Sequence, residues 1–229
     1  MRPVVVIQDG PVPDDAALRW ASKHARLVGA DVETHRSGEA FRAQLVVIQG
    51  RTGSPLGLSR HVVPQVCDPT ACDTVVLRGT PAALRGEHGR ITALVSGGPD
   101  DLAVLDHAAD FARRRGAALR VLHAAPLPII RADLDEDHSR VLAHSTGHLG
   151  GFPHTAVLMR LHPHEAIARC TDTDLLVVGA GETHDCGAVT KAALHHAPCP
   201  VLVVHRPVPE ERHDLAAIPA PRRPVRTTV

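Results

Sequence analysis

The run Asp174-Leu-Leu-Val-Val-Gly179 constrains the fold of this chain more than any other stretch. Its apolar part, residues 175–178, has no polar alternation, so it predicts a strand buried on both faces, as in a parallel sheet. Residues 187–194 then predict a helix, and residues 197–204 predict a second buried strand entered through prolines. Backbone N–H groups and the helix dipole favour a phosphate at a glycine turn between a strand and a helix. The stretch therefore predicts an α/β fold with a candidate phosphate site.

The composition argues against several classes of partner. The 229 residues include 25 basic and 25 acidic side chains, so no broad basic field indicates nucleic-acid binding. Three Phe, one Trp and no Tyr leave few rings on which bases could stack. No apolar run approaches the roughly 18 residues that span a membrane, and the N-terminus enters a strand without a signal peptide. We expect a cytoplasmic protein with neither a nucleic-acid nor a membrane partner.

Cysteines and histidines do not predict a metal site or a disulfide framework. The five cysteines are an odd number scattered through the chain, which favours a reducing compartment. The 17 histidines include only two tight pairs, His162 with His164 and His195 with His196. Neither pair has the spacing of a helical two-histidine zinc site. We expect no bound metal.

Strand and helix patterns alternate twice along the chain. In the first set, the strands are predicted at 4–7, 31–35, 45–48 and 74–77, with helices at 15–28 and 59–66. In the second set, the strands are predicted at 91–95, 119–123, 155–160, 175–178 and 197–204, with helices from 100 to 115, 135–148, 164–170 and 187–194. The acidic groups Asp100-Asp101 and Asp135-Glu-Asp137 are interpreted as solvated helix starts.

The two sets are related by an internal repeat. A shift of 87 residues places Leu18 on Leu105 and Gly29 on Gly116, whereas matching Gly50 to Gly179 requires a shift of 129. The difference, 129 − 87 = 42 residues, is the length of one strand with its helices. The predicted organisation is a truncated unit at 1–79, a polar linker at 80–90, a full unit at 91–205 and a disordered tail rich in proline and arginine at 206–229.

Both units resemble universal stress proteins. The opening strand at 4–7 with Ala17-Leu-Arg-Trp-Ala21 is similar to the start of that family, and Asp174 to Gly179 with Ala197-Pro-Cys-Pro-Val201 is similar to its end. The resemblance implies an open parallel sheet of the adenine-nucleotide α-hydrolase-like type, with strand order 3-2-1-4-5 in each unit. The first unit would then lack its edge strand and helices. It also implies pairing of last strands, in a homodimer or between the two units of one chain.

Many members of the family bind ATP through the motif Gly-x2-Gly-x9-Gly-Ser/Thr, from which this chain departs. In the second unit seven residues separate Gly179 from Gly187, about five fewer than the motif has. Ala188 stands where the family has a hydroxyl, and Ser96 stands where an acidic residue usually meets the nucleotide. The candidate nucleotide-binding residues that the resemblance implies are Asp9, Gly10, Gly50, Gly53, Gly57 and Ser59 in the first unit, and Gly97, Gly179, Gly181, Gly187, Val189 and Thr190 in the second.

These observations predict a regulatory or binding protein of the stress response rather than an enzyme. The sequence contains no nucleophile elbow and no complete Walker lysine loop, so no catalytic residue is assigned. ATP is the one cofactor that the resemblance implies, and the shortened loop predicts weakened or lost binding. Two alternatives stay open: a nucleotide-independent interaction or scaffold protein that acts on a regulatory partner, and a slow ATPase.

Overall fold

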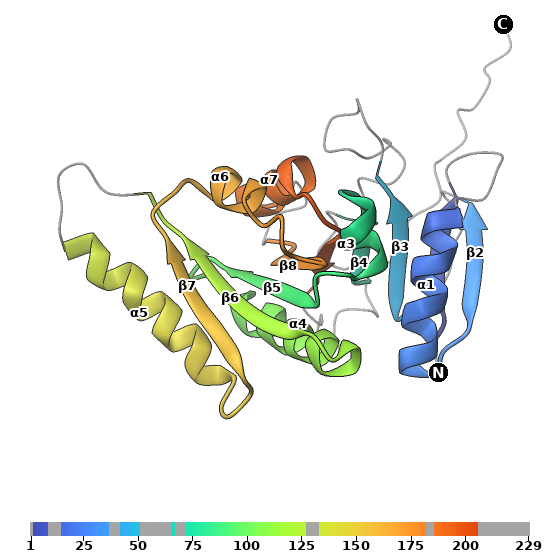
Figure 1. Ribbon diagram of the computed structural model, residues 1–229, viewed down its shortest axis with the longest axis horizontal. Helices are drawn as coiled ribbons and strands as arrows, with labels where there is room; N and C mark the ends of the chain where they lie inside the picture. Colours follow the sequence, from blue (N-terminus) through green and yellow to red (C-terminus); the bar gives the residue numbers. More distant parts are fainter. Residues whose placement is uncertain are drawn as a thin grey trace, which may run out of the picture.

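The fold is a single mixed sheet of nine strands covered by helices, in a computed structural model that describes residues 2–8, 15–36, 42–50, 66, 72–126, 133–181 and 186–205 (Figure 1). The strand order is β2-β1-β3-β4-β9-β8-β5-β6-β7. The strands are β1 (Val4–Gln8), β2 (Val32–Arg36), β3 (Leu45–Gln49), β4 (Thr74–Leu77), β5 (Arg90–Val95), β6 (Ala118–Ala124), β7 (His154–Met159), β8 (Leu175–Gly179) and β9 (Val201–Val204). Every predicted strand is present.

The second half of the sheet has the predicted strand order. Taking its strands β5 to β9 as 1 to 5, their order in space is 3-2-1-4-5, and all neighbours within this half are parallel. The first half contributes β2, β1, β3 and β4, also parallel to one another. Among the described residues its order corresponds to 2-1-4-5 of the same numbering, without a counterpart of the edge strand 3. The central strands are apolar and buried, which is why their sequences show no alternation.

The two halves meet where β4 pairs antiparallel with β9, through Thr74 to Val76 and Val201 to Val203. Every other pairing in the sheet is parallel. The strands of the two halves therefore run in opposite directions. As a result, the carboxyl ends of β1 and β3 lie at one end of the sheet, and those of β5 and β8 lie at the other.

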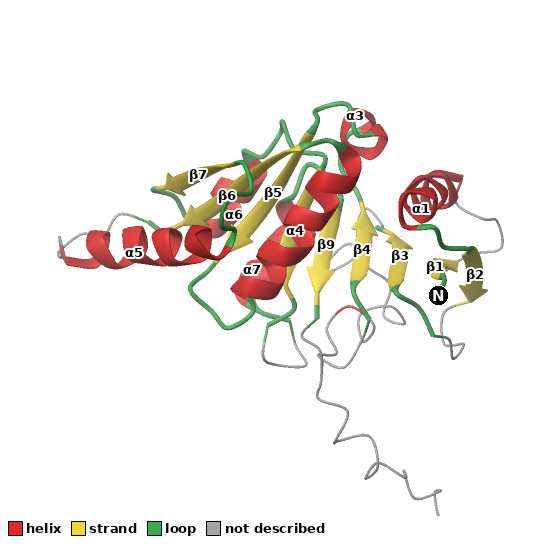
Figure 2. Cartoon of the chain, turned by 90° about the horizontal axis from the view of Figure 1, so that it is seen from below, coloured by secondary structure: helices red, strands yellow, loops and turns green. Residues whose placement is uncertain are grey.

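Helices cover both faces of the sheet (Figures 1 and 2). One core contains buried residues of α1 (Asp15–Val28) and α4 (Asp101–Arg115), with side chains of α5 (Asp133–His148) packed against it. The other core contains buried residues of α6 (Pro163–Ala168) and α7 (Ala188–His196). Burial of small alanines on α1 and α4 lets these helices lie close to the strands.

The segment 80–90, for which the sequence predicts a polar linker, contains the one-turn helix α3 (Pro81–Arg85). Thr80 caps this helix by accepting a hydrogen bond from the Ala83 N–H at 3.2 Å. Buried Asp174 then accepts from the N–H groups of His88 and Gly89, at 3.0 and 2.7 Å. The connection between the halves is thus structured and tied to the start of β8.

The predicted helix at 59–66 lies outside the described residues except for Val66, which is helical, and the tail at 206–229 lies outside them entirely. None of the helices in the described part of the chain combines the length and apolar character that a membrane crossing requires.

The residues that follow β4 hold the two halves together. The Arg78 guanidinium donates hydrogen bonds to the carbonyls of Ala197, at 2.9 Å, and His195, at 2.7 Å. These carbonyls belong to the C-terminal end of α7, where a cation also interacts favourably with the helix dipole. The Thr80 N–H donates to the Pro198 carbonyl at 3.0 Å. The Arg78 side chain and the Thr80 backbone therefore donate hydrogen bonds to the carbonyl groups at and just after the end of α7.

Replacing Arg78 with methionine is expected to lower the free energy of unfolding by about 1–2 kcal/mol, because two carbonyls at the end of α7 lose a charged donor while the apolar stem is kept. Urea unfolding monitored by circular dichroism measures the change. Arg113→Met is the matched control, because Arg113 is an exposed α4 residue whose ion pair with Asp110 spans 3.8 Å. An equal loss in both variants would contradict the role assigned to Arg78.

Candidate functional site

A cleft of about 220 Å³ lies at the carboxyl ends of β5 and β8. Open α/β sheets place ligands at this position, where the strand order reverses direction. The lining residues come from the turn after β5, the loop after β8 and the first turn of α7: Leu94, Ser96, Gly98, Pro99, Asp100, Asp101, Gly179, Gly181, Gly187, Ala188, Val189 and Thr190. Five of the predicted residues, Gly179, Gly181, Gly187, Val189 and Thr190, are therefore brought together.

The two described ends of the loop after β8, residues 180–181 and 186–187, contact each other. Gly181 has a φ of +89°, and a Cβ at this position would lie 2.8 Å from the Gly187 nitrogen. The Gly187 N–H donates to the Ala180 carbonyl at 3.2 Å, and the Thr190 hydroxyl donates to the Gly179 carbonyl at 2.5 Å. The hydroxyl that the sequence offers to a ligand is thus committed to the end of β8.

Asp100 occupies the mouth of this loop. Its Oδ2 accepts a hydrogen bond from the Gly181 N–H at 3.0 Å. A Cβ built on Gly179 would lie 2.5 Å from the Asp100 Cβ and 2.9 Å from Oδ2. Gly179 therefore lacks a side chain where the aspartate packs directly against the end of β8, and a carboxylate uses a loop N–H that could otherwise face a ligand.

Asp101 likewise accepts hydrogen bonds from backbone N–H groups, in the turn that follows β5. Its carboxylate accepts hydrogen bonds from the N–H groups of Ser96, at 3.0 Å, and Gly97, at 2.8 Å. Asp100 and Asp101 do begin α4, as the sequence predicts, but Asp101 is 7% exposed, so the prediction that it is solvated is wrong. The pair follows a turn of small residues directly after a buried strand, and carboxylates readily accept from the backbone N–H groups of such turns.

The described lining residues of the cleft carry two negative charges. The charged side chains among its lining residues are Asp100 and Asp101, and these lining residues include no lysine, arginine or histidine. The opposing feature is the start of α7, where Gly187 is the N-cap without a side-chain hydrogen bond. The first N–H groups of a helix have no partner within it and favour an anion. The positive end of the α7 dipole and two carboxylates therefore line the same cleft.

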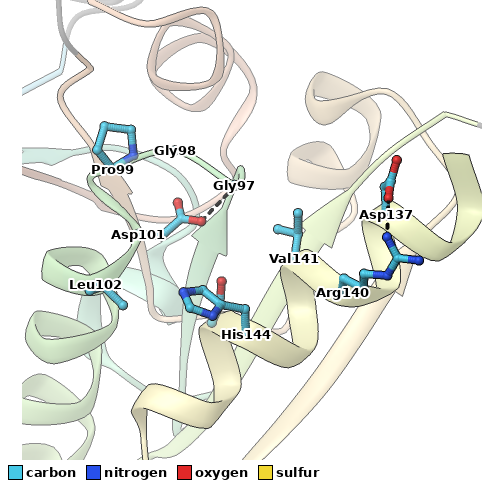
Figure 3. Close-up of a pocket in the computed structure, with 10 residues that line it drawn as sticks. Gly97, Gly98, Pro99, Asp101, Leu102, Asp137, Arg140, Val141 and His144 are labelled. Atoms are coloured by element: carbon cyan, nitrogen blue, oxygen red, sulfur yellow. Dashed lines mark hydrogen bonds and ion pairs between the residues drawn. The ribbon is translucent and has the colours of Figure 1, made fainter.

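A larger cavity of about 530 Å³ adjoins the cleft, and the two share Gly98, Pro99 and Asp101. Figure 3 shows it between the start of α4 and the side of α5 that carries Val141 and His144. The predicted residue Gly97 lines this cavity rather than the cleft, and a Cβ there would lie 3.2 Å from Val141 Cγ2. Its volume is within the range of small-molecule sites.

The first-half candidates are only partly described. Gly50 follows β3, donates its N–H to the Leu77 carbonyl at 2.8 Å and has no room for a Cβ, which would lie 2.8 Å from that oxygen. Gly50 thus has a packing role at the end of β4. Asp9, Gly10, Gly53, Gly57 and Ser59 lie outside the described residues. Because the halves run in opposite directions, Gly50 and Gly179 lie at opposite ends of the sheet.

Among the described residues, no group of three or more His, Cys, Asp or Glu side chains is arranged to hold a metal ion. Cys186, beside the loop after β8, is disulfide-bonded, whereas Cys72, Cys170 and Cys199 are free thiols. The sequence predicted no disulfide framework, because its five cysteines are an odd number, so the disulfide at Cys186 was not predicted. Burial raises the pKa of the Cys199 thiol to about 12, so this thiol is protonated and behaves as a small apolar side chain.

Comparison with known proteins identifies the fold. No family model matches the sequence, and no curated protein matches it. Among solved structures, a putative universal stress protein from Pseudomonas aeruginosa UCBPP-PA14 has a TM-score of 0.58 and 19% identity, covering 88% of this chain and 81% of its own. The fold is that of universal stress proteins.

Two further solved structures are similar to this chain over most of its length. A universal stress protein from Archaeoglobus fulgidus DSM 4304 has a TM-score of 0.52 and 15% identity, over 89% of this chain and 84% of its own. The cytoplasmic domain of a prokaryotic cation chloride cotransporter has a TM-score of 0.55 and 12% identity, over 88% of this chain and 94% of its own. Since one fold serves proteins of such different kinds, function has to be argued from the site.

Proposed function

We propose that this chain is a cytoplasmic regulatory or binding protein of the stress response, and that the cleft at the ends of β5 and β8 is a weak adenine-nucleotide site. The observation that carries the proposal is the position of the cleft: a glycine loop and an uncapped helix start meet at the carboxyl ends of a parallel sheet. The adjoining cavity between α4 and α5 supplies room for the body of such a ligand.

Weak binding follows from the groups already used within the protein. The Gly181 N–H and the Thr190 hydroxyl both donate to protein acceptors, and the described lining residues include no basic side chain. A phosphate would have to displace these hydrogen bonds, each of which contributes about 1 kcal/mol, and would gain few new ones in return. The shortened loop that the sequence predicts acts in the same direction.

A binding role rather than catalysis is supported by the polar side chains of the cleft. The Ser96 hydroxyl lies 3.4 Å from Asp101 Oδ1, and the Thr190 hydroxyl donates to the Gly179 carbonyl. Among the lining residues that the structure describes there is no histidine, so neither hydroxyl faces an imidazole of the kind that activates a serine or threonine nucleophile. The proposal includes pairing of the two units within one chain, supported by the β4–β9 ladder, in place of a homodimer.

The response of the melting temperature to 1 mM ATP tests the proposal. With a Kd of about 1 mM the stabilisation is about 0.4 kcal/mol, which raises the melting temperature by about 1–2 °C. A Kd of about 10 μM would give about 2.7 kcal/mol and a rise of about 5–10 °C, which would contradict weak binding. Ala188→Trp is the control, because Ala188 is exposed and lines the cleft. The indole ring of tryptophan should fill part of the cleft and abolish the small rise in melting temperature.

Mass spectrometry of small molecules released from the denatured protein complements this measurement. A weak site is expected to release no stoichiometric nucleotide. If ATP leaves the melting temperature unchanged in both proteins and titration calorimetry detects no adenine compound, a nucleotide-independent interaction protein replaces the proposal.

A further inference from the structure

We propose that Asp100 determines the class of ligand that the cleft accepts: its carboxylate takes the place of a ligand phosphate, so the native cleft favours phosphate-free compounds such as a nucleoside over phosphate esters. This inference rests on the proposed function for the identity of the nucleoside. The exclusion of phosphate depends on the geometry of Asp100 and can be tested separately.

The first argument is the contact that Asp100 makes. Its Oδ2 lies 3.0 Å from the nitrogen of Gly181, in the loop that leads to the start of α7. A carboxylate oxygen and a phosphate oxygen are equivalent acceptors for such an N–H group. The aspartate is also packed against Gly179, because a Cβ on Gly179 would lie 2.5 Å from the Asp100 Cβ and 2.9 Å from its Oδ2. A phosphate that needs the Gly181 N–H must therefore displace the side chain of Asp100.

The second argument is the charge around that contact. Asp101 places another carboxylate on the neighbouring Ser96 and Gly97 N–H groups and is 7% exposed. Among the described residues that line the cleft, Asp100 and Asp101 are the charged side chains, and none is a lysine, arginine or histidine. Like charges in a partly buried site repel strongly because little solvent screens them. An anionic ligand meets this repulsion, whereas a neutral or cationic hydrogen-bond donor does not.

The third argument is that the start of α4 does not need the Asp100 carboxylate as a cap. Asp100 is the N-cap residue, yet its side chain makes no capping hydrogen bond to the first turn of α4. An N-cap aspartate usually stabilises its helix through such a bond. Here the carboxylate is directed across the cleft to the loop after β8, which fits a role in ligand selection. Replacing it should leave α4 folded.

The test measures adenosine, AMP and pyrophosphate binding by titration calorimetry to the full chain and to Asp100→Ala and Asp100→Asn. In the native protein, AMP is expected to bind about tenfold more weakly than adenosine. Asp100→Ala should raise the affinity for AMP and for pyrophosphate about tenfold or more, while adenosine affinity changes less than about threefold. Asp100→Asn keeps the shape without the charge and should give part of the gain; it also serves if Asp100→Ala does not fold.

Asp106→Ala is the matched control, because it removes an exposed carboxylate from the same helix, where it pairs with His148 at 2.8 Å. This variant should bind all three compounds as the native protein does. A gain in pyrophosphate affinity without adenosine binding would support the role of Asp100 and contradict the adenine-nucleotide site. Adenosine binding with no gain for AMP or pyrophosphate would overturn the inference and leave the proposed function intact. Absence of binding to every variant would overturn both.

Discussion

Replacing Gly79 with alanine is expected to lower the free energy of unfolding by about 3 kcal/mol or more, the largest effect anticipated for a methyl group added to any glycine in the described part of the chain. Gly79 has a φ of +89°, and an added Cβ would lie 2.1 Å from the Pro198 oxygen and 2.5 Å from the Cys199 nitrogen. Both atoms are backbone atoms at the entrance to β9, so no side-chain rotation relieves the clash. The backbone of one half would have to move away from the other.

Gly89→Ala separates this clash from backbone strain. Gly89 also has a positive φ, +65°, but nothing lies within 4 Å of its Cβ position. The control should therefore lose only the strain of a left-handed alanine, about 1–2 kcal/mol. Urea unfolding of both variants measures the difference. If Gly79→Ala is no less stable than Gly89→Ala, the close approach between the halves does not exist.

Acid is expected to destabilise the contact between α1 and α4 through His24. This imidazole is stacked between Trp20, with ring centroids 5.6 Å apart, and Phe111, at 4.7 Å. Burial, followed by the charges of Arg115 and Arg114, lowers the pKa of His24 from 6.5 to about 4. The histidine is thus neutral in the folded protein, and in this pH range the unfolded chain binds the proton more readily.

The sign of the effect follows from that difference. Stability from neutral His24 is fully present above the unfolded pKa of 6.5 and is lost as the pH falls from 6.5 towards 4. The whole difference corresponds to about 3 kcal/mol. His24→Phe has no titrating group at this position, so its free energy of unfolding should fall less than that of the native protein between pH 7 and pH 4.5, by about 2 kcal/mol. Parallel curves for the two proteins would disprove the assignment.

His107 provides a contrast of opposite sign. Its Nε2 lies 2.7 Å from Asp73 Oδ2, and the hydrogen bond to that carboxylate raises the pKa of His107 above 6.5. Its contribution is present below pH 6.5 and is lost as the pH rises through the folded-state pKa. His107→Gln should therefore lose more stability, relative to the native protein, at pH 6 than at pH 8. The comparison also shows that the response of His24 is specific to its burial.

Much of the fold could be predicted from the sequence because its signals are local. Continuous apolar runs such as those of β3 and β8 belong to strands buried on both faces, and glycine ends α4 at Gly116 in a left-handed conformation. The strand order came from the resemblance to universal stress proteins rather than from any single run. Helix α3 was missed because five residues are too few for periodicity, although Thr80-Pro81 is a helix-start signal.

The site was only half predictable, for a physical reason. Glycines after buried strands mark close backbone approaches, so Gly179, Gly181 and Gly187 were found. Asp100 was not, because its partner Gly181 lies 81 positions away and the contact depends on tertiary structure. No local pattern distinguishes an aspartate that begins a helix in solvent from one that reaches across a cleft. Asp100 is also the side chain that we propose selects the ligand class.

The place of β9 has a consequence for the order in which the molecule can form. Counted across the sheet, β9 is the fifth of nine strands, although it is the last of them along the chain. Before β9 pairs with them, β4 and β8 each have an unpaired edge. Val76 pairs with Val201, and all the other strands of the second half lie between these two residues in the sequence. Such distant pairings make folding slow, because a long loop must close first. The central strand β9 is therefore synthesised after the other described strands. We expect the strands on either side of it to depend on chaperones until β9 has been synthesised and has paired with β4 and β8.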